Sequence, residues 1–307
     1  DFTSFTLSEP KYDEEYSKVN KLTYEGSLKA RVKLLNKSIG TTKEQEIFMA
    51  DIPMMTRHGT FIINGVERVI VPQLTRSSGV FFSELDVKAK RLFGAKIIPS
   101  KGVWIEIESD TDGGIYVRVD KKRKFSVVSL LRVLGLEKEE EILKAFDKNE
   151  EAIKAVKISL EKDPAKSTME SYIEIYKRLR DGDLATPENA RDFINTLFSK
   201  ERYDISPIGR LRFNKRFGKP MDEKTLENRT ITADDIVAII GNIVSLNNDI
   251  NANPDDIDHL GQRRVRFVGE MLQQKFRTGM AQIKRNIQDK MSVIDIGTTM
   301  PIQVINQ

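Results

Sequence analysis

The chain has 307 residues, which is enough for two domains of ordinary size. Apolar residues make up 39% and charged residues 31%, so the composition is that of a protein with packed cores and not of a disordered chain. The absence of cysteine excludes disulfides, thiolate zinc sites and cysteine nucleophiles, whereas a net charge of +4 neither requires nor excludes nucleic acid as a partner.

Residues 22–82 have the pattern of β-strands. Shorter segments that mix apolar and polar residues cover residues 22–24, 28–35 and 47–49. Two further runs, 61–63 and 66–74, flank Asn64 and Gly65, which both tolerate the positive φ that a type I′ turn requires. We therefore predict a β-hairpin around these two residues.

A second group of strands is predicted within residues 96–120, at 97–98, 104–108 and 115–119. Apolar and polar residues alternate in the last two, which predicts a sheet with one face in solvent. From about residue 126 the apolar period becomes helical, and we predict helices near 126–134, 138–147, 149–161, 167–180 and 187–199. Thr186 followed by Pro187 is a typical helix cap and first helical residue.

The remaining chain is predicted to be helical in two places. One helix covers residues 231–248, with Thr232 as its N-cap, and a long helix covers about 262–291. Apolar residues of the long helix recur every three or four positions. Strand groups followed by a block of helices predict an α+β protein of two domains.

The sequence shows no evident catalytic centre. Neither His58 nor His259 has a triad partner at a recognisable spacing, and there is no glycine-rich phosphate loop. Asp255, Asp256 and Asp258 precede the predicted long helix. Three roles stay open for these acids: interaction with the helix dipole, polar recognition of a ligand, or binding of a magnesium ion.

Basic residues gather in three places, at 121–124, at 202–219 and in the predicted long helix. Between residues 263 and 290, eight positive and two negative charges give +6, which exceeds the +4 of the whole chain. Such asymmetry is typical of phosphate binding, and the alternative is a solvated helix face. The single tryptophan, Trp104, is either a core residue or a platform for an unpaired base.

Several runs of residues resemble the beta subunit of bacterial RNA polymerase and keep the order found in that family. They are Asp51 to Thr56, Gly59 to Val71, Ala95 to Trp104, Val117 to Lys124 and Asp255 to Arg264. The last run is the most specific, and together the runs span nearly the whole chain. Because the chain also lacks an initiator Met, we expect it to be an excised N-terminal part of such a subunit.

The resemblance implies a particular domain organisation. Residues 1–75 are expected to form the first segment of a sheet-plus-helix domain, the protrusion. Residues 76–203 are expected to form an inserted domain of strands followed by helices, the lobe. Residues 204–307 are expected to complete the protrusion with the long basic helix.

The resemblance also implies roles for individual residues. Those expected to contact DNA are Arg76, Trp104, Lys121, Lys122, Arg123, Ile257, Asp258, Arg263, Arg277 and Arg285. In the family, the residues matching Arg76, Ile257, Asp258 and Arg263 form a pocket for an unpaired guanine of the non-template strand, and the match of Trp104 stacks on a neighbouring base. Arg68, Val71 and Gln73 match a cluster tied to rifamycin sensitivity.

The implied activity is nucleotidyl transfer by a whole polymerase in the cytoplasm, associated with the nucleoid. The family's magnesium ions are held by the beta-prime subunit, so we expect neither a cofactor nor catalytic activity in this chain alone. Expected partners are DNA, the beta-prime, alpha and omega subunits, and sigma factor. No apolar run approaches the roughly 20 residues of a membrane helix, and no signal peptide is evident.

Two alternative functions remain at this stage. The chain is a docking module for transcription regulators or a repair-coupling translocase, or it is an independent DNA-binding protein. Salt dependence separates DNA binding from apolar docking, because only phosphate contacts weaken steeply as salt rises. The missing initiator Met argues against an independent protein.

Overall fold

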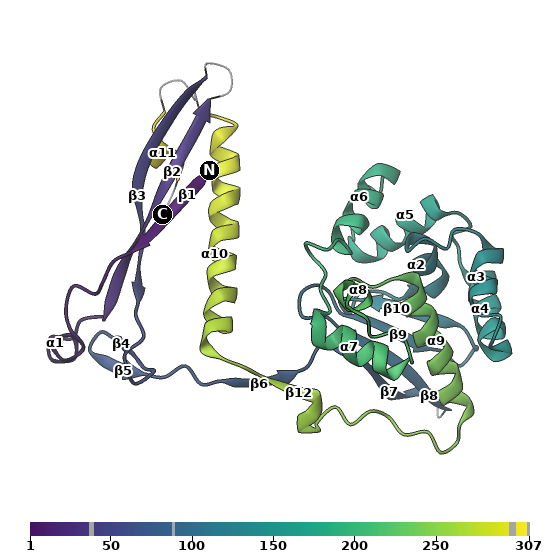
Figure 1. Cartoon of the computed structure of the whole chain (residues 1–307). Coiled ribbons are helices and arrows are strands. Elements are labelled where there is room, and N and C mark those ends of the chain that lie inside the picture. Colours follow the sequence, from purple (N-terminus) through teal and green to yellow (C-terminus); the bar gives the residue numbers. More distant parts are fainter. Residues whose placement is uncertain (37–39, 88–89, 295–298, 306–307) are drawn as a thin grey trace. The chain divides into compact units, whose positions relative to one another are not determined.

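The structure is a computed structural model that describes residues 1–36, 40–87, 90–294 and 299–305 (Figure 1). It divides the chain into two compact units. Unit 1 comprises Asp1–Leu74 and Val265–Gln307, and unit 2 comprises Thr75–Arg264. Helices and antiparallel sheets occur together, which confirms the predicted α+β class.

Unit 1 is built on a three-stranded antiparallel sheet in the order β1-β2-β3. Its strands are β1 (Phe2–Leu7), β2 (Glu25–Asn36) and β3 (Thr41–Pro53), and the short helix α1 (Glu14–Val19) lies between the first two in sequence. The long helix α10 (Val268–Met291) and the short helix α11 (Pro301–Val304) complete the unit. Neither β1 nor α1 was predicted. The sequence of β1, FTSFTL, has no strict alternation of apolar and polar residues, and all six of its residues are exposed in the structure.

The predicted hairpin is present as β4 (Phe61–Ile63) and β5 (Val66–Arg68). Asn64 and Gly65 have φ values of 51° and 80°, as the type I′ turn requires. The strand predicted over 66–74 is interrupted after Arg68 and resumes as β6 (Gln73–Arg76). Residues 22–24 do not form the predicted strand; the carbonyl of Leu22 accepts a 2.8 Å hydrogen bond from the N–H of Gly65.

Unit 2 contains a five-stranded antiparallel sheet in the order β11-β10-β9-β8-β7. The strands are β7 (Gly79–Val87), β8 (Lys90–Ile98), β9 (Ile105–Ser109), β10 (Ile115–Val119) and β11 (Phe125–Ser126). In β9 and β10 every second residue is buried and those between are half-buried. This alternation agrees with the predicted sheet that buries one face, but the other face is half-buried and not fully in solvent.

The helices of unit 2, with the exception of the short α8, contribute apolar residues to one continuous core that they share with this sheet. They are α2 (Val127–Val133), α3 (Glu139–Ala145), α4 (Glu150–Lys162), α5 (Thr168–Leu179), α6 (Pro187–Leu197), α7 (Ser206–Arg216), α8 (Glu223–Glu227) and α9 (Ala233–Asn248). Thr186 caps α6 and Thr232 caps α9, and both caps are as predicted. Helices α7 and α8 were not predicted.

The chain passes between the two units twice, and the second of these crossings differs from the predicted domain boundary. The first crossing, at Leu74 and Thr75, lies next to the predicted position, but the second lies at Arg264 and not at residue 203. Ile205, Phe213 and Ile236 belong to the same core as the sheet of unit 2. Residues 204–264 therefore belong to unit 2, because their apolar side chains are buried there.

The long basic helix is also shorter than predicted. Gln262 ends a short 3₁₀ turn, η1 (Leu260–Gln262), and β12 (Arg263–Arg266) follows it and pairs with β6. Helix α10 then begins at Val268. Five positive and two negative residues remain on the helix, so its net charge is +3 and not +6.

Candidate nucleic-acid interface

Three segments with candidate DNA-binding residues leave the sheet of unit 2 at the same end. Strand register pairs Gly79 with Ile98, Ile97 with Ile105, and Ile105 with Val119. The segments before β7, before β9 and after β10 therefore join the sheet at neighbouring strand ends. Neighbouring strands are about 4.8 Å apart, so these three strand ends lie within about 15 Å of one another.

Arg76, Trp104 and Lys121 are carried by these three segments. Arg76 is exposed at the end of β6, three residues before β7 begins. The carbonyl of Trp104 accepts a 2.9 Å hydrogen bond from the N–H of Asp120, which ties it to the loop after β10. Asp120 and Lys121 both have positive φ, so the chain turns sharply here. The strand register thus brings together residues that lie far apart in sequence.

Trp104 is half-buried and lies outside the main apolar cluster of unit 2. The three basic residues of the adjoining loop, Lys121, Lys122 and Arg123, are exposed. The Arg123 guanidinium lies 3.9 Å from the Asp181 carboxylate, an exposed ion pair that stabilises little. A half-buried indole beside exposed cations is an arrangement typical of single-strand binding.

The segment containing Ile257 and Asp258 runs beside edge strand β7 and is fixed at both ends. At one end, the N–H of Asp255 donates to the carbonyl of Phe82 at 2.9 Å. At the other end, the N–H of Ser77 donates to the carbonyl of Gln262, also at 2.9 Å. Because Arg76 precedes Ser77 and Arg263 follows Gln262, this second bond brings the two arginine positions close to each other.

The three acidic residues of this segment have different roles. The Asp255 carboxylate accepts a 2.7 Å hydrogen bond from the N–H of Phe82 and lies 2.6 Å from the Arg216 guanidinium. Asp256 accepts hydrogen bonds from the N–H groups of Asp258 and His259, at 3.0 and 3.1 Å, and so shapes the turn. Asp258 is exposed, and its carboxylate makes no hydrogen bond within the described residues.

Interaction with the dipole of α10 is the wrong interpretation for these acids. The helix begins at Val268, ten residues after Asp258, with β12 between them. In the part of the chain that the structure describes, no three His, Cys, Asp or Glu side chains are grouped so that they could hold a metal ion. The exposed Asp258 carboxylate is thus the one of the three that neither shapes the turn nor pairs with Arg216.

Two cations of the basic cluster at 202–219 are engaged inside unit 2. Arg210 is buried and donates two hydrogen bonds to the Asp235 carboxylate, at 3.0 and 2.9 Å. Lys219 donates a third, at 2.8 Å. Burial raises the pKa of Asp235, but the hydrogen bonds and positive charges of Arg210 and Lys219 outweigh it and hold that pKa below its ordinary value. These cations stabilise unit 2 and are not available to DNA.

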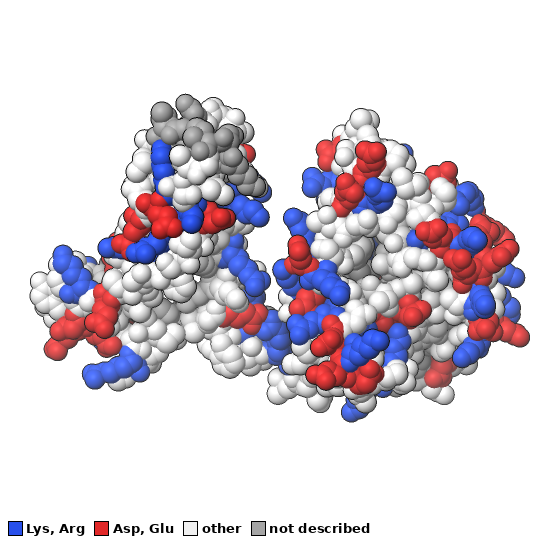
Figure 2. Space-filling model, turned by 45° about the horizontal axis from the view of Figure 1, so that its top comes forward, with Lys and Arg blue, Asp and Glu red and all other residues white. Residues whose placement is uncertain are grey.

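Basic residues that remain on the surface do not all gather in one area. Figure 2 shows basic and acidic side chains interspersed over the visible face of unit 2. One exception is a hollow of about 420 Å³ beside the start of β7, which is lined by Arg212, Lys215, Arg216 and His259 among others and by no acidic residue. Arg212, Lys215 and Arg216 belong to the predicted basic cluster at 202–219, but their grouping on one face with His259 was not predicted. The spacing of three and four between Arg212, Lys215 and Arg216 was the available signal for a shared helix face, and it was missed because α7 was not predicted.

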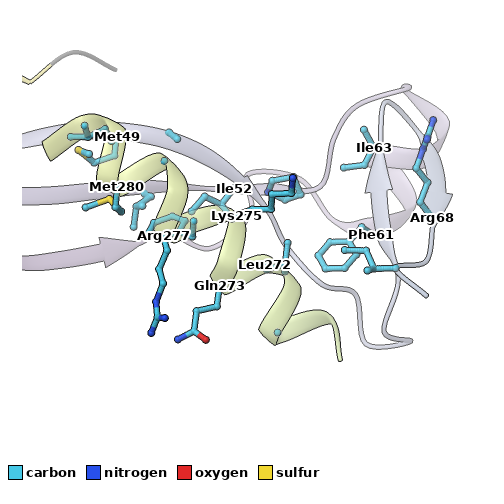
Figure 3. A pocket seen from close by; sticks show the side chains of 18 residues that line it. Met49, Ile52, Phe61, Ile63, Arg68, Leu272, Gln273, Lys275, Arg277 and Met280 are labelled. Carbon is cyan, nitrogen blue, oxygen red and sulfur yellow. The ribbon is translucent and has the colours of Figure 1, made fainter. Parts of the chain in front are cut away.

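In unit 1 the candidate residues lie on and beside an apolar groove of about 1110 Å³ (Figure 3). Leu272 and Met280 of α10 face Met49 and Ile52 of β3 across it, and Phe61 and Ile63 of the hairpin close one end. Of the three residues matched to rifamycin sensitivity, Arg68 lines the groove. Val71 and Gln73 are exposed in and after the interruption between β5 and β6 and do not line it.

Arg277 and Arg285 are both exposed on α10. Arg277 lines the groove at its rim, and Figure 3 shows its guanidinium extending away from the apolar floor. Arg285 is not among the lining residues. These two arginines therefore present charge on unit 1, separately from the candidate residues of unit 2.

Comparison with known proteins identifies the family. Residues 76–266 match the family described as RNA polymerase Rpb2, domain 2, a range close to that of unit 2. A DNA-directed RNA polymerase subunit beta from Syntrophomonas wolfei is 43% identical over 307 residues, covering 99% of this chain. The chain belongs to the family of RNA polymerase beta subunits.

A second relative, the DNA-directed RNA polymerase subunit beta of Gloeobacter violaceus, is 41% identical over 304 residues and covers 98% of the chain. The chain spans only 27% and 26% of the lengths of these two beta subunits. Family membership confirms the resemblance inferred from the motif runs. Among the described helices, none is long and apolar enough to cross a membrane.

Proposed function

We propose that the chain holds DNA within a DNA-directed RNA polymerase and that unit 2 binds an unpaired base of the non-template strand. The observation that carries this proposal is the convergence of Arg76, Trp104, Lys121 and the segment before Arg263 at one end of a single sheet. Residues from four separate parts of the sequence meet there, three of them cationic.

The chemistry of the site suits a guanine. The Asp258 carboxylate is exposed and accepts hydrogen bonds only, whereas the edge of guanine presents adjacent N–H donors. Arg76 and Arg263 supply positive charge for the sugar-phosphate backbone. Trp104 supplies a ring face on which a neighbouring base stacks, a contact worth roughly 1–3 kcal/mol.

In this proposal the polymerase chemistry lies outside the chain. Nucleotidyl transfer uses magnesium ions held by the beta-prime subunit, and the isolated chain does not catalyse it. The remaining partners are the alpha and omega subunits and sigma factor. The chain acts by positioning DNA, and its basic residues in unit 1, Arg277 and Arg285, contact phosphates.

The test uses Asp258→Ala in a whole polymerase assembled with this chain's sequence. Affinity is measured for synthetic bubbles that differ only in the base at the pocket position. We expect the preference for guanine over other bases to fall by about 1–3 kcal/mol, because the discriminating acceptor is lost. Asp234→Ala, which removes an exposed acid from α9, is the matched control. An unchanged base preference would rule out the assignment of Asp258.

The apolar groove of unit 1 favours a second candidate function, the docking of transcription regulators or a repair-coupling translocase. Its apolar lining includes Leu272 and Phe276, which are 45% and 51% exposed. An exposed apolar groove of this kind is typical of protein interaction sites. Salt separates the two functions, since DNA binding weakens steeply between low and moderate salt and apolar docking does not.

A further inference from the structure

The hollow beside β7 has the composition of an anion-binding site. It lies within unit 2, among the start of β7, the second half of α7 and the turn that ends at Gln262. Ten residues line it, among them Arg212, Lys215, Arg216, His259 and Gln262. Three of the ten are cationic, a fourth is histidine, and none is acidic. A phosphate would meet no carboxylate there.

Arg212 has a donor that the protein leaves unused. One amino group of its guanidinium donates to the carbonyl of Gly261. The other, Nη1, is buried and has no hydrogen-bond partner within the described residues. A buried donor without a partner destabilises a protein measurably, so such groups in native structures usually serve a ligand or water.

Two further donors line the same hollow. His259 accepts a 3.0 Å hydrogen bond from the N–H of Gly261 at Nδ1, so the neutral ring carries its proton on Nε2 and donates there. Lys215 is exposed, and its ammonium has no ion-pair partner in the described part of the chain. Arg216, in contrast, is engaged by Asp255 at 2.6 Å and lies over the Phe82 ring at 4.3 Å.

We propose that this hollow binds a backbone phosphate of the same unpaired strand, with Arg212, Lys215 and His259 as its donors. The inference rests on the proposed function and deepens it. His259 directly follows Asp258, and Gln262 lines the hollow and also holds Ser77 next to Arg76. A phosphate bound here is therefore within about one nucleotide of the base that Asp258 contacts. Arg216 positions the site by holding Asp255 and does not bind the phosphate.

The test measures binding of a labelled single-stranded DNA dodecamer to the 307-residue chain by fluorescence anisotropy at several salt concentrations. We expect Lys215→Gln and Arg212→Lys each to weaken binding about fivefold at low salt. Lys215→Gln, which removes a charge, is also expected to reduce the salt slope by about one. Arg212→Lys keeps a donor for the Gly261 carbonyl while removing the planar fork. Lys157→Gln, at an exposed lysine on α4 outside the hollow, is the matched control and leaves both quantities unchanged.

The outcomes separate this inference from the proposed function. If Trp104→Ala weakens binding while both variants of the hollow retain the affinity and salt slope of the unsubstituted chain, the phosphate site is wrong and the proposed function stands. If the unsubstituted chain does not bind the dodecamer at any salt concentration, both fail. Inorganic phosphate, added at constant ionic strength, distinguishes the source of the anion. Full displacement of the strand at millimolar phosphate would overturn the assignment to a strand phosphate in favour of a free-anion site.

Discussion

Units 1 and 2 both combine antiparallel strands with helices, but they bury their apolar residues very differently. Unit 2 has one continuous core in which sheet and helices share buried side chains. The core cluster of unit 1 consists of Ala30, Val32, Ile47 and Ile305. Helix α10, with 24 residues, has no buried residue, although its apolar residues recur every three or four positions. An apolar period therefore predicts that a helix forms and does not reveal how much of its apolar face this chain covers.

The contrast has an energetic consequence. Burial of apolar surface contributes about 25 cal/mol per Å² to folding, so unit 2 gains stability from its own core. Unit 1 relies more on strand pairing, and its exposed apolar side chains include Phe5, Val71 and Phe276. The chain spans about a quarter of the beta subunits that it matches. We expect the stability of unit 1 to depend more strongly on bound partners than that of unit 2.

The largest expected effect comes from the buried ion pair of unit 2. Asp235→Ala leaves Arg210 buried without its carboxylate partner and is expected to destabilise unit 2 by about 3–5 kcal/mol. Urea unfolding measures the loss. Asp234→Ala, at the adjacent exposed position, is the control and is expected to change stability by less than about 0.5 kcal/mol.

The same ion pair predicts how acid affects unit 2. The pKa of Asp235 is lowered in the folded state, so its stabilising contribution is complete above the ordinary value of 3.8. It is lost as pH falls through the lower folded-state pKa. Asp235→Ala lacks this contribution, so acidification is expected to destabilise it less than the unsubstituted chain. Equal acid sensitivity of the two proteins would contradict the depressed pKa.

A matched pair of leucines tests the difference between the two cores. Leu130 in α2 is fully buried, whereas Leu272 in α10 is 45% exposed. We expect Leu130→Ala to lower the free energy of unfolding by about 2–5 kcal/mol and Leu272→Ala by less than about 1 kcal/mol. Both are measured by urea unfolding. Equal losses would mean that the apolar face of α10 is covered within this chain.

A pair of glycines tests how firmly the hairpin of unit 1 is held. Gly65 and Gly59 have nearly the same φ, 80° and 79°, but a Cβ at Gly65 would lie 2.7 Å from the Cα of Lys21, whereas nothing lies within 4 Å at Gly59. Gly59→Ala is expected to cost about 1–2 kcal/mol from the left-handed backbone alone. Gly65→Ala adds the clash and is expected to cost about 2–4 kcal/mol. Thermal unfolding followed by circular dichroism compares them, and equal costs would show that the hairpin is free to move away from α1.

Local signals in the sequence were sufficient for much of the fold. The Asn64-Gly65 pair predicted the hairpin because few residues adopt its φ values, and Thr186 and Thr232 predicted two helix starts because their hydroxyls cap exposed N–H groups. Long-range pairing was not predictable in this way. The apolar period of α10 continues back to Val265, but pairing of β12 with β6 makes that residue part of a strand.

In the candidate site, too, local sequence signals were readable and long-range contacts were not. The motif run from Asp255 to Arg264 drew attention to Asp258. Its difference from Asp255, which accepts a hydrogen bond from Phe82, and from Asp256, which bonds the backbone of the turn, became visible only in the structure. The cluster at 202–219 contains cations of two kinds, because a charge count cannot tell an exposed lysine such as Lys215 from Arg210, whose partner Asp235 lies 25 residues away. Family resemblance supplied only expected roles for these residues. The structure supplied their grouping at one end of the sheet.

Because Ser77 and Gln262 are joined by a hydrogen bond, the chain enters unit 2 and leaves it at almost the same point. An insertion whose two ends meet disturbs its host little, because the host chain needs to close a gap only one strand spacing wide. Such a module tolerates growth, shrinkage or replacement during evolution while the host keeps its fold. The short β6 and β12 pairing thus makes unit 2 a part of this chain that can vary separately from unit 1.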